Sequence, residues 1–437
     1  MRGMTGTRTG RDWGFNVVGY VTANLGLGVA TRNTIGRLME RNERIRAIDV
    51  DPGGGRSKRD LQYAGLIAMS RETTLAVNVF HMNPPEILFH SAEWERYVDV
   101  SDSLNVCVPF WELPRLPPQW AETLAGMDLV LAPTIFIRDA CRKALPDTRV
   151  VHYPQAVDMP AHVMPDRARW KIPKGPVAFL VAFDINSDIE RKNPWGAMDA
   201  FARAFLGDED VRLVVKLNPH ATTELMREQI ERLRARVAAD ARVLLIEESL
   251  AYTDVLSLYA SCDVLVSLHR SEGLGLPQME AMWLGKPVIS TAWSGTMDFM
   301  DEDSACLVPF ELIPVAATQP GYAPSAVGEG QVWADPDLDA AAEWMRRLAL
   351  EPGLKEAKGA AALAGITAHR LFARAHDPFV ELEREWRLAL AEMSSDRPSA
   401  TAFRRALRRA RLRRAPDRAK RFVVLTLRRL HLYPQGD

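Results

Sequence analysis

The chain has few cysteines, no long hydrophobic run and almost no net charge. None of its four cysteines stands in a C-x-x-C pair or at metal-ligand spacing, and each lies in an apolar or mixed segment, so reduced core residues are expected. No stretch approaches the roughly 20 apolar residues that cross a bilayer, and the first thirty residues contain no apolar signal-peptide core. We therefore expect a cytoplasmic protein.

Length and composition indicate an ordinary globular protein. Hydrophobic residues make up 47% of the chain and charged residues 25%, so neither disorder nor a fibrous repeat is indicated. A length of 437 residues is too great for one compact core. It predicts two domains of roughly 150 to 200 residues with a cleft between them.

Short apolar runs rich in β-branched residues alternate with amphipathic stretches in both halves of the chain. Such runs are typical of parallel strands buried on both faces, so the pattern predicts an α/β protein with two doubly wound sheets. Several prolines after Asp158 separate the halves. The runs begin at Asn16, Thr74, Asn105, Leu129 and Val150 in the first half and at Val177, Val211, Val243, Asp263, Pro287 and Ala305 in the second.

The pattern divides the chain into four segments. Residues 12–160 are expected to form an N-terminal Rossmann-like domain, and residues 161–375 a C-terminal one in which residues 314–335 form an irregular loop. Residues 376–396 are expected to form a closing helix that packs back toward the N-terminal domain. Residues 397–437 form a basic amphipathic tail.

The segment S-E-G-L-G-L-P-Q-M-E-A-M, residues 271–282, follows the run that begins at Asp263 and leads into a helix near Pro277. Ligands of doubly wound sheets gather beyond the carboxyl ends of the strands, and a helix N-terminus offers free N–H groups to a diphosphate. Glu272 and Glu280 would flank that diphosphate and accept hydrogen bonds from hydroxyl groups. Taken alone, the spacing is more often that of a surface loop with two solvated glutamates.

Residues 267–295, S-L-H-R-S-E-G-L-G-L-P-Q-M-E-A-M-W-L-G-K-P-V-I-S-T-A-W-S-G, resemble the donor-site signature of the glycosyl transferases group 1 family, which are retaining enzymes of the GT-B fold and the family 4 type. The resemblance implies two Rossmann-like domains that face a central cleft, the first on the acceptor side and the second on the donor side. It also implies a nucleoside diphosphate sugar as donor substrate. Basic side chains and the helix dipole would neutralise the leaving diphosphate, so neither a cofactor nor a metal is expected. The implied catalytic residue is Glu272, and the implied donor-binding residues are Gly273, Leu274, Gly275 and Glu280.

Residues 183–205 look like the first strand and loop of the family's C-terminal domain, where basic side chains contact the donor diphosphate. Arg191, Lys192 and, on the next strand, Lys216 can supply that charge, and a solvated charged turn is the alternative. The commoner family pattern has an arginine about five residues before the lysine. Here residues 184–187 include Asp, Asn and Ser in that neighbourhood, so Arg191 is the first candidate to replace the arginine.

Two features of the N-terminal half resemble family elements that border the reaction centre. The glycine loop with Gly26 and Gly28 follows the first strand and is expected to approach the donor, although a plain turn is the alternative. His81 ends a strand at the place where many family members carry a histidine that faces the donor sugar. We expect it to be catalytic through a hydrogen bond toward the sugar or toward charge developing at the anomeric carbon. A lone histidine is otherwise more often structural.

The segment V-C-V-P-F-W-E-L-P-R-L-P-P-Q-W, residues 106–120, resembles an aromatic and proline-rich loop in a subset of bacterial family members. Sugar rings stack on aromatic faces and pair with carboxylates, so Trp111 and Glu112 are candidates for acceptor binding. Core packing combined with a turn is the alternative.

The end of the chain is strongly basic. Residues 398–437 contain twelve Lys and Arg residues against Asp417 and Asp437, a balance of +10 in a chain whose net charge is -1. From residue 403 to residue 430 apolar side chains fall at helical spacing among arginines, which is typical of interfacial amphipathic helices. We expect an anionic membrane surface as the partner, with a solvated or docked helix as the alternative. No recognition fold for nucleic acid accompanies the arginines.

These features predict a metal-independent, retaining hexosyltransferase of bacterial cell-surface glycan synthesis, placed at the inner face of the membrane and acting on a glycan or a lipid-linked glycan. The chain offers no D-x-D triplet suited to a metal-bridged diphosphate. A glycoside hydrolase, a GT-B relative such as a sugar-nucleotide epimerase or a phosphorylase, and a non-catalytic sugar-nucleotide-binding protein are the alternatives. The motifs leave the nucleotide base, the sugar and the acceptor open.

Overall fold

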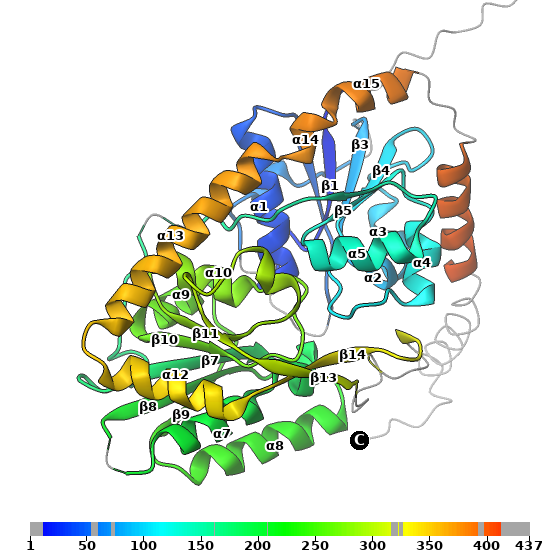
Figure 1. Cartoon of the computed structure of the whole chain (residues 1–437). Coiled ribbons are helices and arrows are strands. Elements are labelled where there is room, and N and C mark those ends of the chain that lie inside the picture. Colours follow the sequence, from blue (N-terminus) through cyan, green and yellow to red (C-terminus); the bar gives the residue numbers. More distant parts are fainter. Residues whose placement is uncertain are drawn as a thin grey trace, which may run out of the picture.

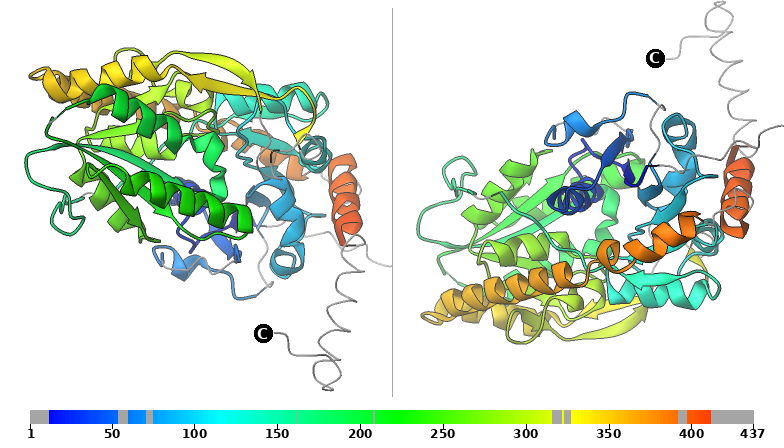
Figure 2. Two further views of the ribbon diagram at one scale, coloured as in Figure 1. Left: turned by 90° about the horizontal axis from the view of Figure 1, so that it is seen from below. Right: turned by 90° about the horizontal axis from the view of Figure 1, so that it is seen from above.

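The computed structural model describes residues 12–53, 60–70, 75–160, 162–207, 209–315, 322, 327–391 and 397–411 of the chain. These residues form two α/β domains, each built on a six-stranded parallel sheet with helices packed against it (Figures 1 and 2). The predicted pair of doubly wound sheets is therefore confirmed.

The N-terminal sheet has the strand order β2-β1-β3-β4-β5-β6. Its central strands are buried along their whole length, and three asparagines link them: Asn78 accepts a hydrogen bond from Asn16 (2.9 Å) and donates one to Asn105 (3.0 Å). This satisfies amide groups that would otherwise be buried without partners. The elements of this domain are β1 (Phe15–Gly19), α1 (Gly26–Glu40), β2 (Ile45–Asp49), β3 (Val77–His81), α2 (Pro84–Phe89), α3 (Ser91–Trp94), β4 (Leu104–Cys107), α4 (Pro118–Leu124), β5 (Leu129–Ala132), α5 (Ile135–Ala144) and β6 (Val150–His152).

The C-terminal sheet has the order β12-β11-β10-β7-β8-β9. The strand order of each sheet reverses once near its centre, between β1 and β3 in the first sheet and between β7 and β10 in the second. Loops beyond these strands are the expected place for a ligand. The elements are β7 (Val177–Asp184), α6 (Ile189–Lys192), α7 (Pro194–Ala204), β8 (Val211–Asn218), α8 (Glu224–Ala238), β9 (Val243–Glu247), α9 (Tyr252–Ser261), β10 (Val264–Ser267), α10 (Leu276–Trp283), β11 (Val288–Thr291), β12 (Cys306–Val308) and α12 (Leu338–Leu350).

The stretch expected to form an irregular loop over residues 314–335 contains regular structure. β14 (Val332–Pro336) pairs antiparallel with β13 (Phe310–Pro314), and the hairpin reaches across to the N-terminal domain. There Gln331 donates a hydrogen bond to the Arg115 carbonyl (2.7 Å). The prediction was wrong for β14 because proline and glycine punctuate the segment, whereas the contact with the other domain stabilises the strands.

α13 (Leu354–Ala375) is a 22-residue helix that links the two domains (Figure 1). It packs on α10, and a Cβ added to Gly359 would lie only 2.3 Å from the Gly285 carbonyl oxygen. Its last turn lies on the N-terminal domain, where Arg37 donates a hydrogen bond to the Ala373 carbonyl (2.8 Å). The sequence pattern does not reveal this helix, because its many alanines give a weak apolar periodicity.

The segment after α13 lies against the N-terminal domain. It forms two short helices, α14 (Pro378–Glu381) and α15 (Glu383–Ala391), where a single closing helix is expected. Phe379 packs edge-on against Phe15, with ring centroids 5.3 Å apart, and Trp386 packs against the same ring. The end of the C-terminal half is thereby fixed to the first domain.

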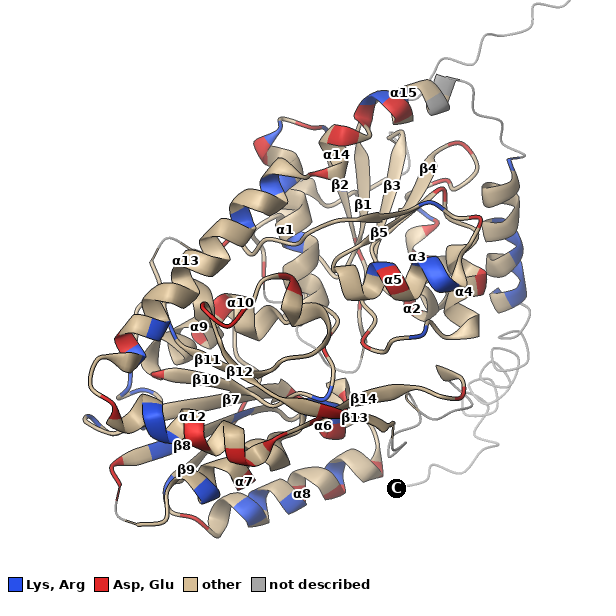
Figure 3. Cartoon of the chain, in the orientation of Figure 1, with Lys and Arg blue, Asp and Glu red and all other residues tan. Residues whose placement is uncertain are grey.

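A further helix, residues 398–411, is docked on the N-terminal domain beside α4 (Figure 2). Phe403 is fully buried and stacks against Trp94, and Leu407 is buried as well. For the first part of the tail the structure therefore shows the docked helix, the alternative to a membrane partner, because the apolar side of the helix packs against the N-terminal domain. Arg405, Arg408, Arg409 and Arg411 of this helix are exposed, and Figure 3 shows the basic residues along it in blue. The second predicted helix, which extends to residue 430, lies outside the described residues. Within the described ranges no helix is long and apolar enough to cross a membrane.

Candidate active site

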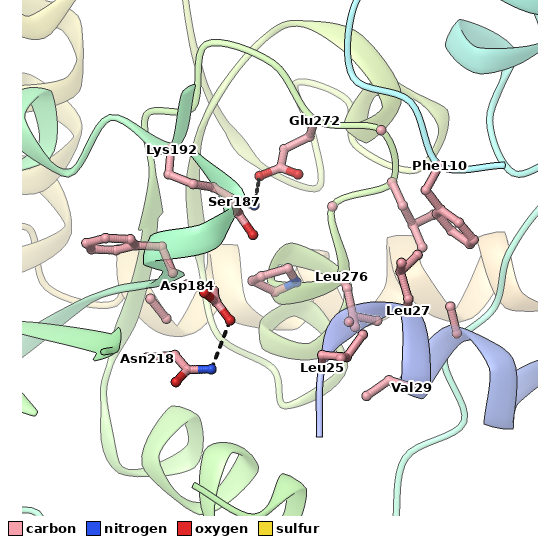
Figure 4. A pocket seen from close by; sticks show the side chains of 18 of the residues that line it. Leu25, Leu27, Val29, Phe110, Asp184, Ser187, Lys192, Asn218, Glu272 and Leu276 are labelled. Carbon is pink, nitrogen blue, oxygen red and sulfur yellow. Dashed lines mark hydrogen bonds and ion pairs between the residues drawn. The ribbon is translucent and has the colours of Figure 1, made fainter. Parts of the chain in front are cut away.

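A cavity of about 460 Å³ opens between the two domains, at the carboxyl ends of β1, β4, β7, β8 and β10 (Figure 4). It is within the size range of small-molecule sites. The residues that line it from the N-terminal domain are Asn24, Leu25, Gly26, Leu27, Val29, Ala30, Asn83, Glu86, Phe110 and Glu112. The other wall includes Asp184, Asn186, Ser187, Arg191, Lys192, Lys216, Asn218, Leu250, Tyr252, Val255, Tyr259, residues 272–277, Glu280 and Tyr322.

The loop between β10 and α10 places Glu272 in the cavity. The Glu272 backbone N–H donates to the Ser294 hydroxyl (2.8 Å), and its carbonyl accepts from the Gly295 N–H (2.9 Å). A Cβ on Gly295 would lie 2.1 Å from the Gly273 carbonyl oxygen, so only glycine permits this approach. Gly275 has a φ of +91° and turns the chain into α10. The glycine pattern of the motif therefore has a direct structural cause.

The one-turn helix α6 carries Arg191 and Lys192. Asp188, with a φ of +62°, caps its start by accepting hydrogen bonds from the Glu190 and Arg191 N–H groups (2.9 and 3.1 Å). Asn193, with a φ of +50°, ends it and donates a hydrogen bond to the Leu268 carbonyl (2.9 Å). Two residues in uncommon backbone conformations thus hold both cations toward the cavity.

The Glu272 carboxylate lies beside both cations, and Figure 4 shows it pointing toward Lys192. Lys192 Nζ donates a hydrogen bond to Glu272 Oε1, and Arg191 Nη1 lies 3.4 Å from Oε2. Burial alone would raise the pKa of Glu272, but the positive charges of Lys192 and Arg191 lower it to about 2. The group is therefore an ionised carboxylate that can only accept hydrogen bonds.

Arg191 is held mainly by backbone carbonyl groups. It is 3% exposed, and it donates to the carbonyls of Ser271 and Ser187, each at 2.8 Å. Its Nη2 also lies 3.6 Å from Glu112 Oε1 of the N-terminal domain, and Glu112 Oε2 accepts from the Tyr322 hydroxyl (3.1 Å). Arg191 thus joins loops of both domains and has little freedom to follow a ligand.

Glu280 lies on α10 and is buried, 3% exposed, with Tyr252 and Lys216 as its polar neighbours. Burial raises the pKa of Glu280 to about 8, although the hydrogen bond from Tyr252 and the charge of Lys216 both act to lower it. Near neutral pH this carboxyl group is largely protonated. It can therefore both donate and accept a hydrogen bond.

Gly26 and Gly28 are predicted from the sequence to approach the donor, and only Gly26 lines the cavity. Gly26 begins α1, and its nearest neighbour across the cavity is Leu276, 4.0 Å from an added Cβ. Gly28 lies behind it, where a Cβ would be 2.3 Å from the Ala23 carbonyl oxygen. Gly28 is needed for the close turn between β1 and α1, which is a packing role.

His81 is not among the residues that line the cavity. Its side chain is fully buried, and Nε2 lies 3.0 Å from the Thr34 hydroxyl, which is 3.2 Å from the Tyr153 hydroxyl. Phe110, which does line the cavity, packs beside the imidazole with ring centroids 5.3 Å apart. Burial lowers the pKa of His81 to about 3, so the ring is neutral.

Of the two predicted acceptor residues, Glu112 lines the cavity and Trp111 does not. The Trp111 ring is 4% exposed, stacks against Tyr322 and donates its indole N–H to the Arg115 carbonyl (2.9 Å). Its own carbonyl oxygen lies 2.8 Å from a Cβ added to Gly273. Trp111 therefore supports the contact between the two domains.

Sequence reasoning missed two tyrosines of the cavity wall, Tyr252 and Tyr322. Neither stands in a motif, and each meets its carboxylate partner, Glu280 or Glu112, only in the folded chain. Among the described residues, no group of three or more His, Cys, Asp or Glu side chains is placed to hold a metal ion.

Residues 180–311 match the family model described as Glycosyl transferases group 1. The matched segment contains the loop between β10 and α10, the two cations of α6 and Lys216, so the resemblance read from the sequence is confirmed for this part of the chain. No curated protein sequence matches the chain.

The two-domain architecture is the GT-B fold. Sucrose-phosphate synthase from Thermosynechococcus elongatus is 14% identical with a TM-score of 0.60, over 87% of this chain and 100% of that one. The α,α-trehalose 6-phosphate synthase from Burkholderia multivorans is 12% identical with a TM-score of 0.56, over 87% and 98%. HepE from Anabaena is 11% identical with a TM-score of 0.53, over 87% and 100%. At such identities these likenesses show the fold.

Proposed function

We propose that this chain is a retaining glycosyltransferase that moves a hexose-type sugar from a nucleoside diphosphate sugar to an acceptor hydroxyl. The observation that carries the proposal is the buried, ionised Glu272 beside Lys192, in a cavity between two Rossmann-like domains and within the segment that matches the glycosyl transferases group 1 family. HepE from Anabaena was solved with UDP and glucose, which supports a nucleotide sugar as the donor.

The diphosphate fits the positive side of the cavity. Lys192 and Lys216 offer ammonium groups, and the N-termini of α1 and α10 lie at the cavity wall through Gly26 and Gly275. Free N–H groups and the helix dipole favour an anion there. This supports neutralisation of the leaving diphosphate without a metal ion. Arg191 would act indirectly, because it holds the loop between β10 and α10 through the Ser271 carbonyl.

The two glutamates would bind different hydroxyl groups of the donor. Glu272, as a carboxylate, accepts hydrogen bonds from the transferred sugar, and this interaction can strengthen as positive charge develops at the anomeric carbon. Glu280, with Tyr252 beside it, would bind the ribose hydroxyls. Glu112 faces the same cavity from the N-terminal domain and is the candidate for orienting the acceptor. We assign His81 a supporting role behind Phe110.

Release of nucleoside diphosphate in the presence of acceptor glycans tests the proposal, with UDP and GDP sugars as donors and an NMR assignment of the product anomer. We expect Glu272→Ala to abolish transfer with the fold intact, and Glu280→Ala chiefly to weaken donor binding. Release that is independent of acceptor would favour a hydrolase, and interconversion of free sugar nucleotides an epimerase. Wild-type turnover in both variants would exclude the site assignment.

We further propose a lipid-linked glycan at an anionic membrane as the acceptor, in bacterial cell-surface glycan synthesis. The basic balance of residues 398–437 supports this proposal, as do Arg405 and Arg408, which are exposed on the docked helix. Flotation with anionic liposomes should compare the full chain with a chain that ends at Arg411, which keeps the docked helix in place. We expect the shorter chain to lose most of the binding. Equal, negligible binding by both would argue against a membrane.

A further inference from the structure

Lys192 and Glu272, the two groups proposed to contact the donor, are paired with each other. The side chains of Lys192 and Glu272 are 15% and 9% exposed, and the ammonium group donates a hydrogen bond to the carboxylate. Neither group can serve a ligand fully while that pair is intact, because one oxygen of Glu272 and one proton of Lys192 are occupied.

We propose that Glu272 is an intramolecular competitor for the diphosphate site, and that an incoming diphosphate exchanges with its carboxylate at Lys192. The proposal rests on the proposed function and adds a role for Glu272 that precedes the chemistry. After the exchange the freed carboxylate oxygen accepts hydrogen bonds from the donor sugar.

The surroundings of the pair permit such an exchange. Lys192 is the last residue of α6 and has a flexible four-carbon stem, so its ammonium group can move toward a phosphate. Arg191 cannot follow, because the carbonyls of Ser187 and Ser271 hold it. Its Nη1, 3.4 Å from Glu272 Oε2, keeps the carboxylate in place after Lys192 has turned away. The low pKa of Glu272 means that the competitor is charged at every ordinary pH.

The exchange would distinguish a sugar nucleotide from the nucleoside diphosphate that remains after transfer. An intact donor replaces the broken ion pair with hydrogen bonds from its sugar to Glu272. The product diphosphate has no sugar, so it displaces Glu272 from Lys192 without compensation. The same side chain thus favours donor binding and product release.

Calorimetric titration of UDP and of GDP into four proteins tests this inference: the wild type, Glu272→Gln, Lys192→Met and the double variant. Glu272→Gln should bind whichever of UDP and GDP the wild type binds at least about tenfold more tightly than the wild type does. The reason is that an opposite charge in direct contact changes an equilibrium constant by about one to three powers of ten. In the Lys192→Met background the same substitution should change the affinity less than about twofold. The control Glu302→Gln, at an exposed carboxylate outside the cavity, should leave the affinity unchanged.

Unchanged or weaker binding by Glu272→Gln would overturn the inference, as would equal tightening in the Lys192→Met background, which would indicate simple repulsion. Glu272→Asp provides a second measurement if the glutamine variant does not fold. It keeps the charge but has a shorter reach toward Lys192, so it should also bind the diphosphate more tightly. If neither UDP nor GDP binds to any of these proteins, the proposed function fails and the inference fails with it.

Discussion

Replacing Glu280 by glutamine should stabilise the protein, and the gain should grow with pH. In the unfolded chain this carboxyl group loses its proton near its ordinary pKa of 4.5, whereas burial keeps it protonated in the folded protein up to about pH 8. The folded state therefore binds one proton more than the unfolded state between these values. The wild type loses stability as the pH rises through that window and loses no more above it.

The size of the effect follows from the shift. Each pKa unit corresponds to 1.36 kcal/mol, so moving the pKa from 4.5 to about 8 costs the wild type about 4 to 5 kcal/mol above pH 8. Glutamine cannot ionise and avoids this cost. Urea unfolding at pH values from 5 to 9 should show the difference between variant and wild type rising over this range. The exposed control Glu302→Gln should show no trend. A difference for Glu280→Gln that is constant with pH would refute the assigned protonation state.

Three further outcomes are expected. Gly295→Ala should lower the free energy of unfolding by about 1 to 3 kcal/mol and impair donor binding, because its Cβ would press against the Gly273 carbonyl. Gly26→Ala is the control: its Cβ would have 4.0 Å of clearance, so it should unfold at the same urea concentration as the wild type. Phe403→Ala should cost about 3 to 5 kcal/mol of local stability and raise hydrogen exchange in residues 398–411, and the exposed Arg405→Ala should leave exchange unchanged. Excess EDTA should leave the transfer rate unchanged, and a rate that falls and is restored by Mg²⁺ or Mn²⁺ would reject the metal-free proposal.

Most of the strands could be predicted because each buried parallel strand is a short apolar run with a turn after it. β2 escaped this criterion, since Arg46 and Asp49 interrupt its apolar pattern at the edge of the sheet. α13 escaped it for a different reason, because alanine and glycine allow close approach to α10 without producing an amphipathic stripe. Elements whose stability comes from tertiary contacts leave little local signal.

In the site, too, some residues have a local sequence signal and others are brought together only by tertiary contacts. Glu272 and Gly275 could be placed because a strand, a glycine turn and a helix N-terminus lie within one segment. The link between Glu112 and Tyr322 spans 210 residues, so no local pattern contains it. His81 stands at the end of a strand, and its enclosure between Phe110 and the Thr34 hydroxyl arises only in the folded chain.

Two glutamates separated by seven residues are chemically identical in the sequence, yet the fold places them in opposite states. Glu272 lies beside two cations and stays ionised. Glu280 is buried beside Tyr252 and Lys216, whose effects on its pKa are weaker than that of burial, and it keeps its proton. Neighbouring acids whose pKa values are driven apart in this way usually have different tasks. A charged carboxylate at Glu272, which accepts hydrogen bonds, suits a sugar that gains positive charge during transfer. A neutral carboxyl group at Glu280, which both donates and accepts hydrogen bonds, suits hydroxyl groups that do not react. Under the proposed function, the division between the reacting and the binding half of the nucleotide sugar would follow from the side chains that surround each carboxyl group.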